Sequence, residues 1–202
     1  MAAYTAIAEV SKTLIALLRT AVENREEVLT LDAENISLSD PTDVSPDDQT
    51  RLSVSLYHLE ENAATTNTQP RHQTETTVAE GSPLGVDLYY LLTAHPGDSD
   101  DSTAQRLEQQ RVLGFVLQTF HDNRIVRGEQ LTDELEADEP LTISLVDDSR
   151  SERTNRWSTT PETAFQPSVL YRVSPAVIDS KQRETLTPVT ERETRLERQP
   201  ES

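Results

Sequence analysis

Residues 83–94 read PLGVDLYYLLTA, and this stretch decides the class of fold. Every second side chain along it is apolar, which is the period of a half-buried β-strand. The expected inward-facing residues are Leu84, Val86, Leu88, Tyr90 and Leu92. Residues 51–59 alternate in the same way, with Leu52, Val54 and Leu56 on one face. Two strands of this kind predict a sheet with one face against a hydrophobic core.

Two helices are predicted around these strands. Residues 3–22 carry apolar residues at the spacing of one helical face: Ile7, Val10, Leu14, Leu17, Leu18 and Val22. Residues 102–121 predict a second helix, with Ser102 and Gln105 as a capping box. Its expected apolar stripe is Leu107, Leu113, Val116, Leu117 and Phe120. Gly114 costs a helix interior up to about 1 kcal/mol relative to alanine, so we expect it to allow close contact with a neighbouring element.

The remaining elements are shorter. Strands are predicted at 28–31, 36–38, 141–146 and 169–173, and short helices at 128–135 and 149–157. Pro175 is expected to limit the last strand, because proline cannot donate a ladder hydrogen bond. Residues 63–81 are rich in polar residues without an apolar period, which predicts a long loop. The sum is an α+β fold, with a single mixed or antiparallel sheet flanked by two main helices.

The charge balance is strongly acidic. The chain has 202 residues, 36 acids and 18 bases, for a net charge of −18. Lys12 and Lys181 are its only lysines, and the other bases are arginines. Such a surface is typical of proteins adapted to molar salt, which shortens the Debye length to roughly 3 Å. An ordinary acidic protein from a low-salt cytoplasm is the alternative. Either way, the charge argues against binding nucleic acid or an anionic membrane.

Charge also divides the chain into two parts. Residues 1–179 carry 13 bases and 31 acids, and we expect them to form the α+β domain. Residues 180–202 carry five of each and have no apolar period. We interpret them as an extended C-terminal arm that reaches a neighbouring subunit, or as a disordered tail without a specific role.

The sequence offers little for catalysis. It has no cysteine, which excludes disulfides and thiolate chemistry, and its histidines have no metal-ligand spacing. Gly-rich phosphate loops and nucleophile elbows are absent, and the acid clusters lie in polar segments. We therefore expect no enzyme activity, no cofactor and no metal. With no signal peptide and no membrane-length apolar run, we expect synthesis and assembly in the cytoplasm.

Several segments, taken in order, match one family. They are residues 52–62 (LSVSLYHLEEN), residues 83–94, Glu108 with Val112-Leu113-Gly114, Trp157-Ser158, and residues 165–178 (FQPSVLYRVSPAVI). Over about residues 4–179 the chain resembles the cap, or tail-terminator, proteins of extracellular contractile injection systems. These are phage-tail-like particles, and the acidic composition suggests a haloarchaeal-type member.

The resemblance implies a phage tail-terminator-like fold and a structural role. The protein would form a homo-oligomeric ring, a hexamer, on the last layer of the inner tube and in contact with the last sheath layer. It would stop tube growth, set particle length and leave the cell only within a released particle. The residues expected at interfaces are Tyr57, Asn62, Tyr89, Trp157, Tyr171, Arg183, Arg192 and Arg195. A baseplate or cargo-adaptor subunit of the same particle, or a small acidic hydrolase, are the alternatives.

Overall fold

The computed structural model describes residues 4–25, 30–45, 48–62, 78–97, 99–128, 131, 140–147 and 166–185. For residues 78–80 and 183–185 it describes the backbone. All statements about the structure below concern these residues. The predicted helix at 149–157 lies outside them, as do most of the predicted helix at 128–135 and half of the predicted strand at 28–31. The described half of that strand, Thr30 and Leu31, forms no strand.

Most of the chain folds around one six-stranded sheet. The helices are α1 (Ala6–Glu23), the short 3-10 helix η1 (Ala33–Asn35) and α3 (Ser102–Asp122). The strands are β1 (Ile36–Leu38), β2 (Leu52–Glu61), β3 (Val78–Glu80), β4 (Leu84–Ala94), β5 (Ile125–Val126), β6 (Leu141–Leu145), β7 (Ser168–Ile178) and β8 (Arg183–Thr185). The large sheet has the order β1-β2-β4-β7-β6-β5, in which β1 runs parallel to β2 and the other neighbours are antiparallel.

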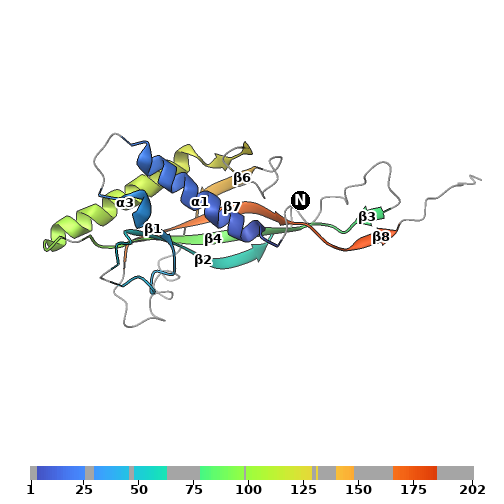
Figure 1. The fold of residues 1–202 in the computed structure, drawn as a ribbon, viewed down its shortest axis with the longest axis horizontal. Coiled ribbons are helices and arrows are strands. Elements are labelled where there is room, and N and C mark those ends of the chain that lie inside the picture. Colours follow the sequence, from blue (N-terminus) through green and yellow to red (C-terminus); the bar gives the residue numbers. More distant parts are fainter. Residues whose placement is uncertain are drawn as a thin grey trace, which may run out of the picture.

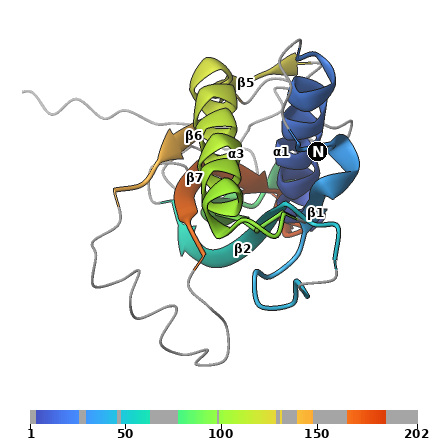
Figure 2. The ribbon, with the colours of Figure 1, turned by 90° about the vertical axis from the view of Figure 1, so that its left-hand side faces the viewer.

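The sheet curls beneath both main helices, which lie on its concave side (Figure 2). The core forms between them. Leu14 and Leu18 from α1 belong to one buried cluster with residues of β2 and β4. Phe120 from α3 packs edge-on against Tyr171 of β7. The Tyr90 hydroxyl lies 2.8 Å from Ser11 Oγ on α1, so Tyr90 points into the concave side. The predicted α+β fold with one mixed sheet and two main helices is confirmed.

Helix α3 differs in detail from its prediction. Its N-cap is Asp101, whose Oδ1 accepts a hydrogen bond from the Thr103 amide at 2.8 Å, so the predicted cap at Ser102 is wrong by one residue. The buried face is also rotated relative to the predicted stripe. Leu107 and Leu117 are 48% and 37% exposed. The buried residues are instead Gln109, Val112, Phe115, Val116, Thr119 and Phe120.

The prediction for Gly114 is wrong as well. A Cβ atom added at this residue would meet nothing within 4 Å, so no neighbouring element approaches the helix there. Among the described residues, no close contact at this position requires a glycine. Packing therefore does not offset the lower helix propensity of glycine.

Two strand predictions also need correction. Strand β7 continues through Pro175 to Ile178, because Ser174 is the last β7 residue that pairs with β6 and the missing N–H of Pro175 falls beyond that pairing. The predicted loop 63–81 ends too late, since β3 occupies Val78–Glu80 and pairs with β8.

Strands β3 and β8 form a ribbon that projects from the body beyond the ends of β4 and β7 (Figure 1). It is joined to them closely. The Gly81 amide donates to the Gln182 carbonyl at 2.9 Å, and a Cβ at Gly81 would lie 2.6 Å from Ser180 Oγ. A side chain at residue 81 would therefore force Ser180 to shift where these two segments cross. Among the described helices, none is both long and apolar enough to cross a membrane.

Candidate interface on the outer face of the sheet

A bulge in β2 gathers three aromatic rings on the face of the sheet away from the helices. Leu56 lies opposite Tyr90 and His58 lies opposite Tyr89, so Tyr57 is an extra residue in the ladder. Because Tyr90 points toward α1, its neighbour Tyr89 points outward. The Tyr57 ring centroid lies 6.2 Å from that of His58 and 6.3 Å from that of Tyr89, and the last two are 5.3 Å apart.

A second bulge places a carboxylate beside this cluster. Val86 pairs with Ala176 and Leu88 with Val173, so Asp87 on β4 faces two residues of β7. Asp87 is buried, with only 7% of its surface exposed. An ionised carboxylate at such a depth is costly unless its oxygens are paired and hydrogen-bonded.

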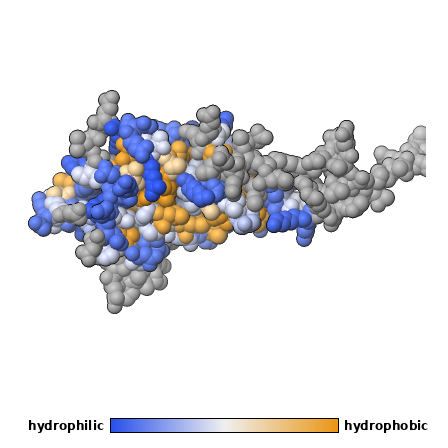
Figure 3. Space-filling model, in the orientation of Figure 1, coloured by the Kyte–Doolittle hydropathy of each residue, from blue (hydrophilic) through white to orange (hydrophobic). Residues whose placement is uncertain are grey.

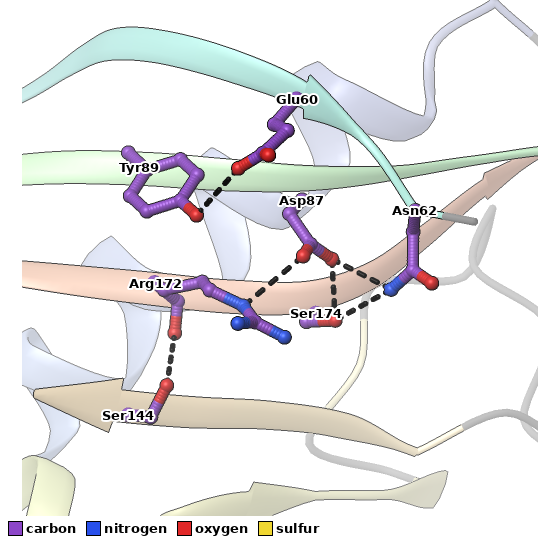
Figure 4. A network of polar contacts seen from close by, with 7 residues as sticks. All are labelled: Glu60, Asn62, Asp87, Tyr89, Ser144, Arg172 and Ser174. Atoms are coloured by element: carbon purple, nitrogen blue, oxygen red, sulfur yellow. Dashed lines mark hydrogen bonds and ion pairs between the residues drawn. The ribbon is translucent and has the colours of Figure 1, made fainter. Parts of the chain in front are cut away.

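Three side chains supply the partners of Asp87 (Figure 4). Asn62 donates from Nδ2 to Asp87 Oδ1 at 2.8 Å, and the Ser174 hydroxyl donates to the same oxygen. Arg172 Nε lies 3.1 Å from Asp87 Oδ2 as an ion pair without hydrogen-bond alignment. The network therefore ties the end of β2 to the middle of β4 and β7.

The aromatic cluster is anchored in the same region. The Tyr89 hydroxyl donates to Glu60 Oε2 at 2.8 Å (Figure 4). This bond to a carboxylate, together with burial, raises the pKa of Tyr89 because both disfavour the phenolate. Tyr57 keeps 37% of its surface exposed. Aromatic rings held by a fixed polar network are typical of the centre of a protein–protein interface.

The structure brings together three of the eight residues expected at interfaces, namely Tyr57, Asn62 and Tyr89. Tyr171 lies elsewhere: it is 4% exposed against Phe120, and burial raises its pKa to about 12. Arg183 belongs to β8 in the projecting ribbon. Trp157, Arg192 and Arg195 lie outside the described residues.

The sequence reasoning missed Asp87, Arg172 and Ser174. A signal was present for the first of these, because an acid between Val86 and Leu88 interrupts an otherwise apolar strand. A buried acid on a strand demands partners, and those partners come from residues far away in the chain.

A separate groove of about 720 Å³ lies between the end of α3 and strands β5 to β7. Its lining residues are Leu117, Gln118, Phe120, His121, Arg124, Ile125, Thr142, Ile143, Ser144, Leu145 and Tyr171. A hydrolase built on the acid clusters would need carboxylates in a pocket, and this lining has none. Within the part of the chain that is described, no three His, Asp or Glu residues form a metal-binding group.

The fold defines a class: an α+β protein whose curled mixed sheet carries two helices on its concave side. Within that class, the chain belongs to the family described as the Pvc16 N-terminal domain, which matches residues 9–192. No curated protein matches the chain.

Two solved structures are similar. One is the PVC sheath/tube terminator of an extracellular contractile injection system in its extended state, with a TM-score of 0.60 and 18% identity. The match covers 96% of this chain and 64% of that one. The other is the tube-terminating cap of the anti-feeding prophage, with a TM-score of 0.55 and 18% identity over 93% of this chain and 60% of that one. The likeness shows a shared fold, and this chain spans less than two thirds of either protein.

Proposed function

We propose that the protein is a non-enzymatic cap, or tail terminator, of a contractile injection system. It closes the distal end of the inner tube, anchors the terminal sheath layer and sets particle length. The observation that carries the proposal is the family match over residues 9–192, joined to a fold shared with two tube-terminating proteins.

The outer face of the sheet supports this role physically. Asp87, Asn62 and Arg172 lock three strands together beneath the exposed edge of Tyr57. A surface of this kind presents a fixed shape, and the described residues form no group of three metal ligands. Copies of the chain assemble as a hexameric ring, in which each subunit contributes two different faces. The inner tube and the sheath are its other partners.

Assembly takes place in the cytoplasm of a cell with a salty interior. The net charge of −18 keeps the surface hydrated there, while molar salt screens repulsion between neighbouring subunits. The protein leaves the cell only as a part of a released particle.

Electron microscopy of particles from cells that lack the protein tests the proposal. Loss of a cap leaves tube growth without a stop, so the tubes will have a broad length distribution and unanchored sheaths. The alternative roles predict other results. Loss of a baseplate subunit blocks assembly at its start, and loss of a cargo adaptor leaves particles of uniform length. Either of those results would contradict the cap role.

Residues 180–202 form an arm that contributes to these contacts. Deleting them will weaken ring formation or sheath attachment, because the arm carries a local charge balance that the acidic body lacks. Ring formation is measured by mass in solution and sheath attachment by co-sedimentation. Wild-type behaviour in both assays would rule the arm out.

A further inference from the structure

The second half of strand β2 pairs with a described strand on one side only. Strand β1 pairs with Leu52–Val54, and the last contact along it joins the Ser39 amide to the Val54 carbonyl at 3.1 Å. From Ser55 onward, β4 is the only described strand that pairs with β2. The open stretch is on the order of 20 Å long at about 3.3 Å per residue.

The peptide group of Leu59 points out of this open edge. The Asn62 amide donates to the Gly85 carbonyl at 2.9 Å, so Asn62 faces β4. Peptide groups alternate along a strand, which turns Glu60 toward β4 and Leu59 away from it. The Leu59 side chain is also 47% exposed.

The same edge opens onto apolar surface. Leu56 is partly buried against the core, and Leu84 at the start of β4 is 44% exposed. Figure 3 shows hydrophobic residues gathered along the sheet below α1, on the side where β2 lies. An open edge beside an apolar surface is a template for strand addition unless it is covered.

The projecting ribbon supplies a strand that needs such a template. Strands β3 and β8 have three residues each, and a two-stranded ribbon is marginally stable in water on its own. Residues 183–190 read RETLTPVT, and the threonines and valine favour an extended strand. Lys181, Arg183 and Glu184 lie at or just before the start of this segment, whereas the open end of β2 carries the two acids Glu60 and Glu61.

We propose that residues 183–190 of one copy add as a strand to the open edge of β2 in the next copy, beside Leu59. The arm and the edge are different surfaces of one chain, so the contact is head-to-tail and closes into a ring when the rotation permits. The proposal deepens the cap role proposed above and rests on it for the ring.

A proline at the edge is the most direct test. Leu59→Pro removes an N–H that points away from β4, so it blocks an added strand and leaves the β2–β4 ladder intact. Leu145→Pro on β6 is the matched control. The Ile143 amide donates to the Arg124 carbonyl on the side away from β7, so the peptide group of Leu145 points outward as well, and its side chain is 58% exposed.

Ring formation by the two variants is measured by sedimentation at low and molar salt. Leu59→Pro will raise the concentration needed for rings by about tenfold or more, whereas Leu145→Pro will assemble like the wild type. Matching circular dichroism and thermal midpoints confirm that both variants fold. Unimpaired rings from Leu59→Pro, or loss of rings from Leu145→Pro alone, would overturn the proposal.

Complementation tests the direction of the contact. Leu59→Pro keeps the arm, and a chain ending at Asp179 keeps the edge. Each alone will remain monomeric, and their mixture will form a one-to-one pair and no ring. A mixture that stays monomeric contradicts the head-to-tail contact. A chain ending at Asp179 that forms rings by itself contradicts it too, and a sheath-only role for the arm predicts that second result.

Disulfide trapping gives an answer even where the proline variant fails to fold. The chain has no cysteine, so any crosslink arises from introduced residues. Leu59→Cys combined with Thr185→Cys, Leu186→Cys or Thr187→Cys will yield covalent multimers up to the ring in at least one pair, since bridging needs Cα atoms within about 7 Å. Leu107→Cys, at an exposed helix position, replaces Leu59→Cys in the control.

The outcomes separate this contact from the cap role. Rings without multimers in any of the three pairs contradict the edge contact and leave the cap intact. A wild-type chain that forms no ring at any salt concentration and ignores tube ends contradicts both.

Discussion

Asp87 is the residue on which the outer face depends. Its carboxylate joins Asn62, Ser174 and Arg172, which come from β2 and β7. Removing it takes away the oxygen that accepts from Asn62 and Ser174 and leaves Arg172 without its ion-pair partner. An unsatisfied buried group costs about 1–3 kcal/mol. The free-energy effect at Arg172 is smaller than for a buried pair, because that side chain is 43% exposed.

We therefore expect Asp87→Ala to lower the free energy of unfolding by about 2 kcal/mol, measured by urea denaturation. Glu60→Gln is the control, because Glu60 is exposed and keeps an oxygen to accept from Tyr89. Its effect should stay within about 0.5 kcal/mol. Equal losses in the two variants would show that Asp87 has no special role.

His95 makes stability depend on pH. Its side chain is buried with Nε2 2.8 Å from Ser53 Oγ, and burial, followed by the charge of Arg51, lowers its pKa from 6.5 to about 4. Between these two values the folded protein binds fewer protons than the unfolded chain. The contribution of His95 is therefore present above pH 6.5 and is lost as the pH falls toward 4.

The loss amounts to about 3 kcal/mol over this range, at about 1.4 kcal/mol per pKa unit. A His95→Gln variant lacks this pH-dependent contribution. The difference in free energy of unfolding between the wild type and the variant will therefore shrink as the pH falls from 7 to 4. Urea denaturation at each pH measures this, and the carboxylates titrate alike in both proteins. A constant difference across the range would contradict the buried neutral imidazole.

At the level of residues, the sequence predicts the site in part. Tyr57, Asn62 and Tyr89 were expected at interfaces, and the structure places them in one region of the outer face; their role at an interface stays a prediction. Tyr171 shows the limit: an aromatic residue with a polar tip suits both a core and an interface, and only the packing against Phe120 separates the two.

Helices and strands with a strong apolar period are predictable over most of their length. Helix α1, β2 and β4 differ from their predicted bounds by a few residues at most. Strands β3 and β8 could not be predicted, because three residues carry no period and the two strands lie about half the chain apart in the sequence. The face of α3 was misjudged because Gln109 and Thr119 are buried, and Gln109 donates to the Ala94 carbonyl at 2.9 Å.

The cap of α3 is a testable feature of that element. Asp101→Ala removes the acceptor of the Thr103 amide and should cost about 1 kcal/mol. Asp100→Ala, one residue earlier and outside the cap position, is the control for lost charge. Thermal unfolding measures both, and equal shifts in the two midpoints would contradict the assignment of the cap.

Two glycines should respond oppositely to alanine. Gly114→Ala should stabilise the protein by up to about 1 kcal/mol, because the added methyl meets nothing and the helix gains propensity. Gly81→Ala should destabilise the ribbon, because its Cβ would collide with Ser180. Chemical denaturation checks the first variant and amide exchange at β3 and β8 the second. Destabilisation by Gly114→Ala would mean that its surface is covered.

For the whole molecule, the proposed cap role depends on shape. A rigid curled sheet, an outer face fixed by Asp87 and a projecting ribbon give one chain several distinct contact surfaces. From the composition we expected no nucleic-acid binding and no catalysis. Composition carries no information on position, so it could not locate an assembly surface. The order of the matched segments carried that information.

The most direct measurement adds the purified chain to assembled inner tubes in molar salt and images the ends by electron microscopy. The account predicts one ring at the distal end of each tube, after which that end no longer elongates when tube protein is supplied. Tubes that keep growing at both ends, with the chain left as a monomer in solution, would contradict it.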